Sequence, residues 1–405
     1  MDGALRWLYA CRGESIGVGQ TTSRSKIGFH LLTNLGNSMK KLTLVAGAVL
    51  GLVSATSAMA QSSVTLYGIV DAAVSYTSKQ VGGSKTAIDA GQLATSRWGM
   101  RGTEDLGGGL KANFTLESTI ANDTGAAPGA FGTPAQSSLF DRAAIVGVSG
   151  GFGAVTLGRQ NILAVDAVGA VDPIGFSQPG INPNVAFSSL NNGLVTAYGT
   201  NGGQTALRQN NSIRYALPTM SGFNGAAMYG FGEQAGNSSA NTYVGLVGSF
   251  NAGPITASLG YNQLKNASLT AATTDKLTLV GGGVKYAISD AFAVKATYTQ
   301  SKADIAPQRK IAVAGVGVDF TVMPALTLTA AYYNTKRSGD FDSKANQLVG
   351  KVNYALSKRT SIYALVTNEK VNDGNQPVAQ RVGLIATTLG ENSANRIAIG
   401  VFHAF

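Results

Sequence analysis

Segments in which apolar and polar residues alternate recur sixteen times along this chain. A period of two is typical of a strand whose two faces meet different surroundings. The last segment, residues 396–405, places Ile397, Ile399 and Val401 on one face. An apolar strand at the end of a long chain would be an adhesive sheet edge if it stayed unpaired. We therefore expect it to pair with the first segment, residues 64–76, and to close the sheet into a barrel.

The connections between these segments alternate between short and long. The short ones, such as 105–109 and 251–254, carry the Gly, Pro, Asn, Asp and Ser of tight turns. The long ones, such as 78–95 and 370–394, are polar. Strict alternation places every long loop at one end, as in outer-membrane barrels with short periplasmic turns and long external loops. The sequence thus predicts an all-β fold, a 16-stranded antiparallel transmembrane β-barrel.

The amino-terminal region has the layout of an export signal. Residues 39–41 read Met-Lys-Lys, an apolar run covers 42–53, and 58–60 read Ala-Met-Ala. A charged start, an apolar core and an A-x-A site are typical of a cleaved signal peptide, and the core is short for a membrane anchor. We expect an upstream extension outside the native protein at 1–38, a secretory signal peptide at 39–60 and the mature barrel at 61–405.

Composition excludes several functions for the mature chain. Its net charge is about +6, without the Lys/Arg clusters that bind nucleic acid, so no nucleic-acid partner is expected. The cysteine, Cys11, lies in the leader, and the mature chain keeps only His403. A serine nucleophile usually needs a histidine base, and a transition metal needs clustered His or Cys ligands. We therefore expect no enzyme, no catalytic residues, no metal and no cofactor.

A soluble β-sandwich would show the same alternation of apolar and polar residues. Three features favour the membrane barrel: the leader, the long loops at one end, and tyrosines near strand ends, where aromatic girdles mark membrane interfaces. The mature chain also has no apolar run of about 18 residues that would form a helical span. The tyrosines expected at the interfaces are Tyr76, Tyr286, Tyr298, Tyr332 and Tyr354.

Five stretches of the mature chain are long and specific together: SSVTLYGIVDAAVSY at 62–76, SRWGMRGTEDLGGGLKANFTLES at 96–118, FDRAAIVGVSGGFGAVTLGRQ at 140–160, NNSIRYALP at 210–218 and the closing HAF. With them, essentially all of 61–405 resembles the general trimeric porins of Gram-negative outer membranes, β-proteobacterial type. One departure is Phe402, where the family usually has an arginine before the terminal histidine.

The resemblance implies a function and a set of partners. It implies a channel in outer-membrane lipid for passive diffusion of small hydrophilic solutes and ions, and a homotrimer. It also implies a carboxyl-terminal signal, ending in Phe405, that the barrel-assembly machinery recognises. The location would be the outer membrane of a Gram-negative cell.

The longest connection, 163–210, carries Asp166 and Asp172 and has no clear strand. Open loops of that length are uncommon in compact proteins and usually functional. The resemblance implies that it is the third external loop, folded into the barrel, where it narrows the channel. We expect its two carboxylates to form the acidic side of a pore constriction.

Strand parity places many basic side chains on the lumen face. An Arg or Lys facing lipid at mid-bilayer would cost about 2–4 kcal/mol, and a lumen position avoids that cost. By parity, the constriction wall carries Arg97, Arg101 and Arg214, and the resemblance adds Arg142. The other lumen charges expected by parity are Lys111, Lys285, Lys295, Lys351 and Arg396.

The excess of basic lumen residues favours a weak anion preference, although charges at the constriction could reverse it. Two other functions stay open at this point. The first is a substrate-specific channel with a binding site in the constriction. The second is a surface adhesin or receptor barrel whose external loops carry the function.

Overall fold

The structure is a computed structural model that describes residues 63–125, 138–187, 207–265, 276–304, 308–372, 374–375, 381–385 and 388–405. The chain divides into two compact units, 1–59 and 60–405, and the first lies outside the described residues. The predicted extension 1–38 and signal peptide 39–60 therefore lie outside the described part of the chain.

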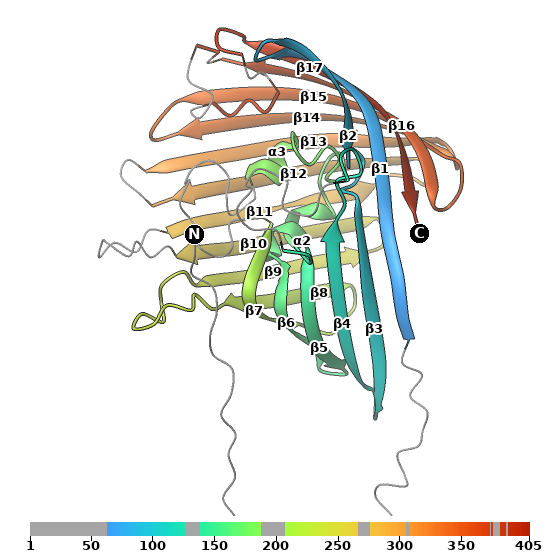
Figure 1. The fold of residues 1–405 in the computed structure, drawn as a ribbon, viewed down its shortest axis with the longest axis vertical. Helices are drawn as coiled ribbons and strands as arrows, with labels where there is room; N and C mark the ends of the chain where they lie inside the picture. Colours follow the sequence, from blue (N-terminus) through green and yellow to red (C-terminus); the bar gives the residue numbers. More distant parts are fainter. Residues whose placement is uncertain are drawn as a thin grey trace, which may run out of the picture. The chain divides into compact units, whose positions relative to one another are not determined.

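In the described part of the chain, sixteen strands pair in succession and close an antiparallel barrel, which confirms the predicted fold (Figure 1). Each strand pairs with the next, and β17 pairs with β1 from Ile69 opposite Ala404 to Thr77 opposite Arg396. The strands are β1 (Ser63–Gln80), β3 (Arg97–Gly107), β4 (Leu110–Thr119), β5 (Ala143–Gly150), β6 (Gly153–Asn161), β7 (Arg208–Ala216), β8 (Phe223–Gly230), β9 (Tyr243–Ala252), β10 (Ile255–Lys265), β11 (Lys276–Ala287), β12 (Phe292–Ala303), β13 (Arg309–Met323), β14 (Leu326–Ser338), β15 (Ser343–Ala355), β16 (Thr360–Val371) and β17 (Ser393–Ala404).

A further strand, β2 (Gly83–Ala90), lies inside the connection 78–95, which we expected to be a loop. It pairs with the second half of β1, whereas β3 pairs with the first half. Both therefore occupy the same place beside β1, and the barrel keeps sixteen positions. Asp71 of β1 marks the break, because its carboxylate accepts the backbone N–H groups of Leu93 and Ala94 between the two strands.

The two faces of the sheet follow the predicted parity. In β17, Ile399 is 63% exposed on the outer surface, whereas the next inward residue, Ala398, is fully buried. Aromatic residues gather outside near the short turns, where Phe223 and Phe250 have ring centroids 4.6 Å apart. All five tyrosines expected at the membrane interfaces are exposed on the outer face.

Among the described residues, no helix is long and apolar enough to cross a membrane.

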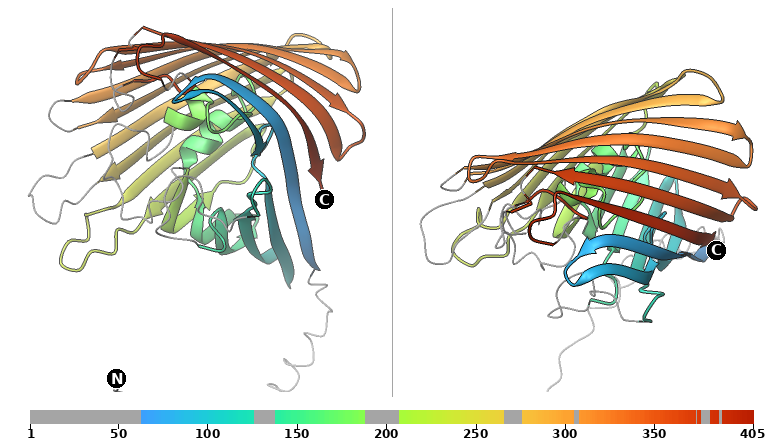
Figure 2. Two further views of the ribbon diagram at one scale, coloured as in Figure 1. Left: turned by 45° about the horizontal axis from the view of Figure 1, so that its top comes forward. Right: turned by 90° about the horizontal axis from the view of Figure 1, so that it is seen from above.

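The first part of the connection after β6, residues 162–187, is folded, in contrast to the open loop that the sequence suggested. It forms α2 (Leu163–Gly169) and α3 (Pro183–Phe187), which lie on the inner side of the sheet (Figure 2). The first helix packs on β8 to β11 and the second on β12 and β13. Helices this short are only marginally stable by themselves, so packing against the wall stabilises them. Their sequences are also too short to show a clear helical periodicity.

Candidate functional site

The helix α2 is held against the inner wall at its amino-terminal end. The first backbone N–H groups of a helix have no partner inside it. Here the N–H of Leu163 donates to the hydroxyl of Tyr243 at 3.0 Å, and the N–H of Ala164 donates to Oδ1 of Asn262 at 3.0 Å. Side chains of β9 and β10 therefore fix where α2 begins.

Asp166 projects from α2 toward β7, the strand next to β8 in the wall that α2 packs on. Its Oδ2 lies 2.7 Å from Nη2 of Arg214 on β7. Burial raises the pKa of the Asp166 carboxyl above its usual value of 3.8, and the adjacent Arg214 guanidinium opposes that shift only in part. The structure thus brings together one predicted loop acid and one predicted wall arginine.

Asp172 lies elsewhere, inside the folded loop. Its carboxylate accepts the backbone N–H groups of Ile174 at 3.1 Å and Phe176 at 2.9 Å. It also accepts the Asn184 amide at 2.8 Å and the hydroxyl of Tyr333 on β14 at 3.2 Å. Asp172 therefore stabilises the fold of the loop and joins it to β14. No hydrogen bond or ion pair in the described part of the chain links it to Arg97, Arg142 or Arg214.

Two of the predicted lumen lysines hold the same stretch of loop. Nζ of Lys295 lies 2.7 Å from Oδ2 of Asp319 and donates to the carbonyl oxygen of Pro173 at 3.2 Å. Nζ of Lys351 donates to the carbonyl oxygen of Ile174 at 2.9 Å. Both side chains point inward, as parity predicted, and they bind the loop to β12, β13 and β15.

Glycines on the inner wall make room for the loop. A Cβ at Gly260 would come within 2.7 Å of the Ala167 side chain, and one at Gly283 within 3.0 Å of Val171. A Cβ at Gly317 would lie 2.8 Å from Cβ of Pro173. The backbone of the loop segment can therefore lie close to the sheet along β10 to β13.

The basic wall centres on a carboxylate that the sequence analysis did not single out. Glu117 on β4 accepts Nε of Arg142 at 2.6 Å and the Tyr67 hydroxyl at 2.9 Å. Arg97 lies beside them and donates from Nε to the carbonyl oxygen of Thr95 at 2.9 Å. The alternation along 110–120 already gives Glu117 the lumen parity, whereas its ion pair with Arg142 depends on the fold.

Two further arginines join this wall, Arg159 and Arg208, and both were missed. Nε of Arg208 donates to the carbonyl oxygen of Arg142 at 2.9 Å, and Nε of Arg159 donates to that of Asp141 at 2.7 Å. Arg97, Arg142 and Arg159 all lie close enough to Arg208 to act on its charge. We call Arg97, Arg142, Arg159 and Arg208 the arginine cluster.

Of the remaining predicted residues, Arg101 adjoins the basic wall and the lysines lie farther away. The Arg101 guanidinium stacks 5.2 Å from the ring centroid of Tyr67, whose hydroxyl donates to Glu117. Lys111 is exposed near the short turn after β3. Lys285 is half-buried on β11. Arg396 pairs with Asp89 of β2 and donates to Oγ1 of Thr77 at 2.7 Å, and Phe405 pairs with β1.

Within the described ranges, no group of three or more His, Cys, Asp or Glu side chains could hold a metal ion. The described interior offers electrostatic chemistry, with the guanidinium groups of the arginine cluster and an inserted segment whose Asp166 pairs with Arg214.

Comparisons with known proteins agree with this architecture. Residues 44–374 match the family described as Gram-negative porin. The chain is 36% identical over 376 residues to outer membrane porin protein 32 of Delftia acidovorans. The alignment covers 91% of this chain and 100% of that protein.

Two solved structures extend the comparison. The anion-selective porin from Comamonas acidovorans has a TM-score of 0.72 at 30% identity, over 85% of this chain and 100% of that one. OmpT of Vibrio cholerae in a trimer form has a TM-score of 0.60 at 18% identity, over 85% of this chain and 99% of that one, and so shares the fold.

Proposed function

Because this chain belongs to the Gram-negative porin family, we propose that the folded loop and the arginine cluster together form the constriction of its channel. The protein is an outer-membrane porin of a Gram-negative bacterium, and its barrel provides a water-filled path for small hydrophilic solutes and ions. Passage through such a channel involves no chemical step, and the family consists of channels rather than enzymes.

The observation that carries this proposal is the charge distribution across the interior. Support comes from the described residues of the interior, where the arginine cluster gathers around Arg208 and Asp166 of the folded loop pairs with Arg214. Glu117, Asp141 and Asp166 compensate only part of that positive charge. Rings of charged side chains select ions by sign. A net positive constriction therefore favours anions, in line with the solved porin described as anion-selective.

The roles of single residues follow from this distribution. Arg97, Arg142 and Arg214 would form the wall that attracts anions, with Asp166 as the acid that faces it. Asp172 would act through the fold of the loop rather than through its charge. Lys295 and Lys351 would hold the loop, and Arg101, stacked on Tyr67, would add positive charge beside Glu117. Lys111 and Lys285 would line the wider parts of the lumen.

The assembly of the protein is part of the same proposal. A homotrimer is supported by the resemblance to trimeric porins and by the trimer form in which OmpT has been solved. Recognition by the barrel-assembly machinery is supported by the terminal aromatic residue, Phe405, at the closing seam of the barrel.

Planar-bilayer recordings of the purified protein test the proposal. A channel for passive diffusion should give stepwise openings whose current rises in proportion to voltage and salt concentration. A saturable block of the current by one solute would instead indicate a substrate-specific channel. The absence of any openings would contradict the channel and favour an adhesin or receptor barrel.

A further inference from the structure

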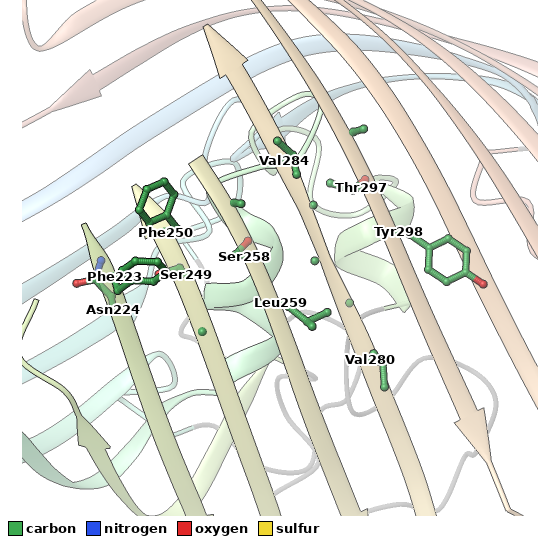
Figure 3. A pocket seen from close by; sticks show the side chains of 16 residues that line it. Phe223, Asn224, Ser249, Phe250, Ser258, Leu259, Val280, Val284, Thr297 and Tyr298 are labelled. Atoms are coloured by element: carbon green, nitrogen blue, oxygen red, sulfur yellow. The ribbon is translucent and has the colours of Figure 1, made fainter. Parts of the chain in front are cut away.

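The outer face of β8 to β12 carries an apolar groove of about 740 Å³ (Figure 3). Figure 3 looks onto this face, with Phe223 and Phe250 at one end of the groove and Tyr298 at the other. Leu259 and Val284 stand between them, 63% and 46% exposed. The groove thus has large apolar side chains as walls on an otherwise convex surface.

The cross-strand register explains why the surface is hollow here. Leu259 lies opposite Gly248 on one side and Gly282 on the other. In the neighbouring row, Ala257 lies opposite Val284, which lies opposite Ala296. Small residues therefore alternate with large ones across adjacent strands, and the small ones form the floor.

The glycines at 281–283 lie between the folded loop inside the barrel and the groove outside it. On the inner side, Gly283 makes room for Val171 of the folded loop. On the outer side, a Cβ at Gly282 would lie 2.0 Å from the carbonyl oxygen of Ser258, so backbone leaves no place for a side chain there. The floor of the groove at Gly282 is therefore fixed by the packing of the sheet.

The groove begins near the short turns on β8 to β10 and reaches the middle of β11 and β12. Its residues on β9 and β10, among them Phe250 and Ala257, lie next to the turn between Ala252 and Ile255. Short turns of outer-membrane barrels face the periplasm. The paired rings of Phe223 and Phe250 stand at that end, where an aromatic girdle meets the lipid headgroups. The groove is therefore continuous with the lipid-contacting surface of the periplasmic leaflet.

We propose that this groove binds one acyl chain of a glycerophospholipid from the periplasmic leaflet. An unfilled hollow forfeits van der Waals contacts with its lining, and lipid tails supply apolar groups at this depth. A flexible methylene chain can follow the narrow floor between the Leu259 and Val284 side chains. The headgroup would stay near Phe223 and Phe250, at the end closest to the short turns.

Native mass spectrometry tests this proposal, with the protein purified from outer membranes and supplied with phosphatidylethanolamine. The variant Gly248→Leu fills the groove, and nothing lies within 4 Å of a Cβ at Gly248, so the sheet should tolerate it. Gly350→Leu is the matched control on β15, because Gly350 is also exposed with no atom within 4 Å of an added Cβ. Resistance of each barrel to unfolding in detergent checks that both variants fold.

The expected result is that Gly248→Leu retains one phospholipid fewer per chain, while Gly350→Leu retains as many as the parent protein. Lipid A, which comes from the opposite leaflet, should bind equally to all three proteins. An unchanged phospholipid count in Gly248→Leu would overturn the proposal, as would equal losses in both variants. A change of oligomeric state in Gly248→Leu without loss of lipid would assign the groove to a protein contact instead. If Gly248→Leu does not fold, Ala257→Leu gives the same test.

Discussion

The aromatic ring of Phe405 occupies the space beside Gly68 on the first strand. A Cβ at Gly68 would lie 2.3 Å from Cζ of Phe405 and 2.6 Å from the carbonyl oxygen of Arg97. The two backbones also exchange hydrogen bonds, from the N–H of Gly68 at 3.1 Å and from that of Phe405 at 3.0 Å. The last residue of the chain is thus built into the seam that closes the barrel.

The first prediction is that Gly68→Ala weakens this seam. Because the added methyl group meets both a ring and a backbone carbonyl, overpacking should lower the stability of the folded barrel by about 1–3 kcal/mol. The temperature at which the barrel unfolds in detergent measures the loss. The control is Gly350→Ala, where an added Cβ meets no atom within 4 Å. This variant should unfold at the same temperature as the parent protein.

Deletion of Phe405 should impair assembly more than transport. The ring and its two backbone hydrogen bonds lie at the closing seam, away from Asp166 and Arg214 in the interior. The amount of folded protein in outer membranes should fall, whereas the conductance of each channel that forms should stay the same. A normal yield of channels with altered conductance would contradict this role.

Acid should increase the preference for anions. Burial raises the pKa of Asp166, so its carboxylate is neutralised as the pH falls toward that raised value. The constriction then becomes more positive. In a salt gradient, the reversal potential should therefore shift toward the equilibrium potential of the anion. Asp166→Asn should show the shifted potential already at pH 7 and should lose most of the pH dependence. If the reversal potential of Asp166→Asn changed with pH as that of the parent protein does, Asp166 would not be the group responsible.

Lys351→Met should loosen the folded loop. It removes the hydrogen bond to the Ile174 carbonyl, and leaving a buried acceptor without its partner costs about 1–3 kcal/mol. Single-channel recordings should show more frequent fluctuations of the current. Lys285→Met, which removes an interior lysine that makes no hydrogen bond or ion pair in the described part of the chain, should leave the open-channel noise unchanged.

The sequence was informative wherever side chains follow a period of two. All sixteen barrel positions, the seam and the outward faces could be predicted, because lipid and water on opposite sides of a strand impose that period. Local propensity was a weaker guide for β2, α2 and α3, since pairing with β1 and packing on the inner wall stabilise these short elements. Their positions depend on tertiary contacts that no local pattern records.

The arginine cluster shows the same limit at the level of single residues. The register between β6 and β7 shifts between Gly158 and Gln160, so parity does not indicate the direction of Arg159. Arg208 is the first residue of β7, but it lies within the connection 163–210 expected from the sequence and was counted with that loop. Asp172 was correctly placed in the loop, but its enclosure by Ile174, Phe176 and Tyr333 depends on the fold of that loop.

The reversal potential under a gradient of potassium chloride tests the proposed channel most directly. The reversal potential of the parent protein should have the same sign as the equilibrium potential of chloride. Replacing Arg97, Arg142 and Arg208 together by Gln should shift it toward the equilibrium potential of potassium. Lys358→Gln removes a positive charge from the exposed turn between β15 and β16 and should change little. A cation-selective parent channel, or a triple variant with an unchanged potential, would contradict the assignment of anion preference to the arginine cluster.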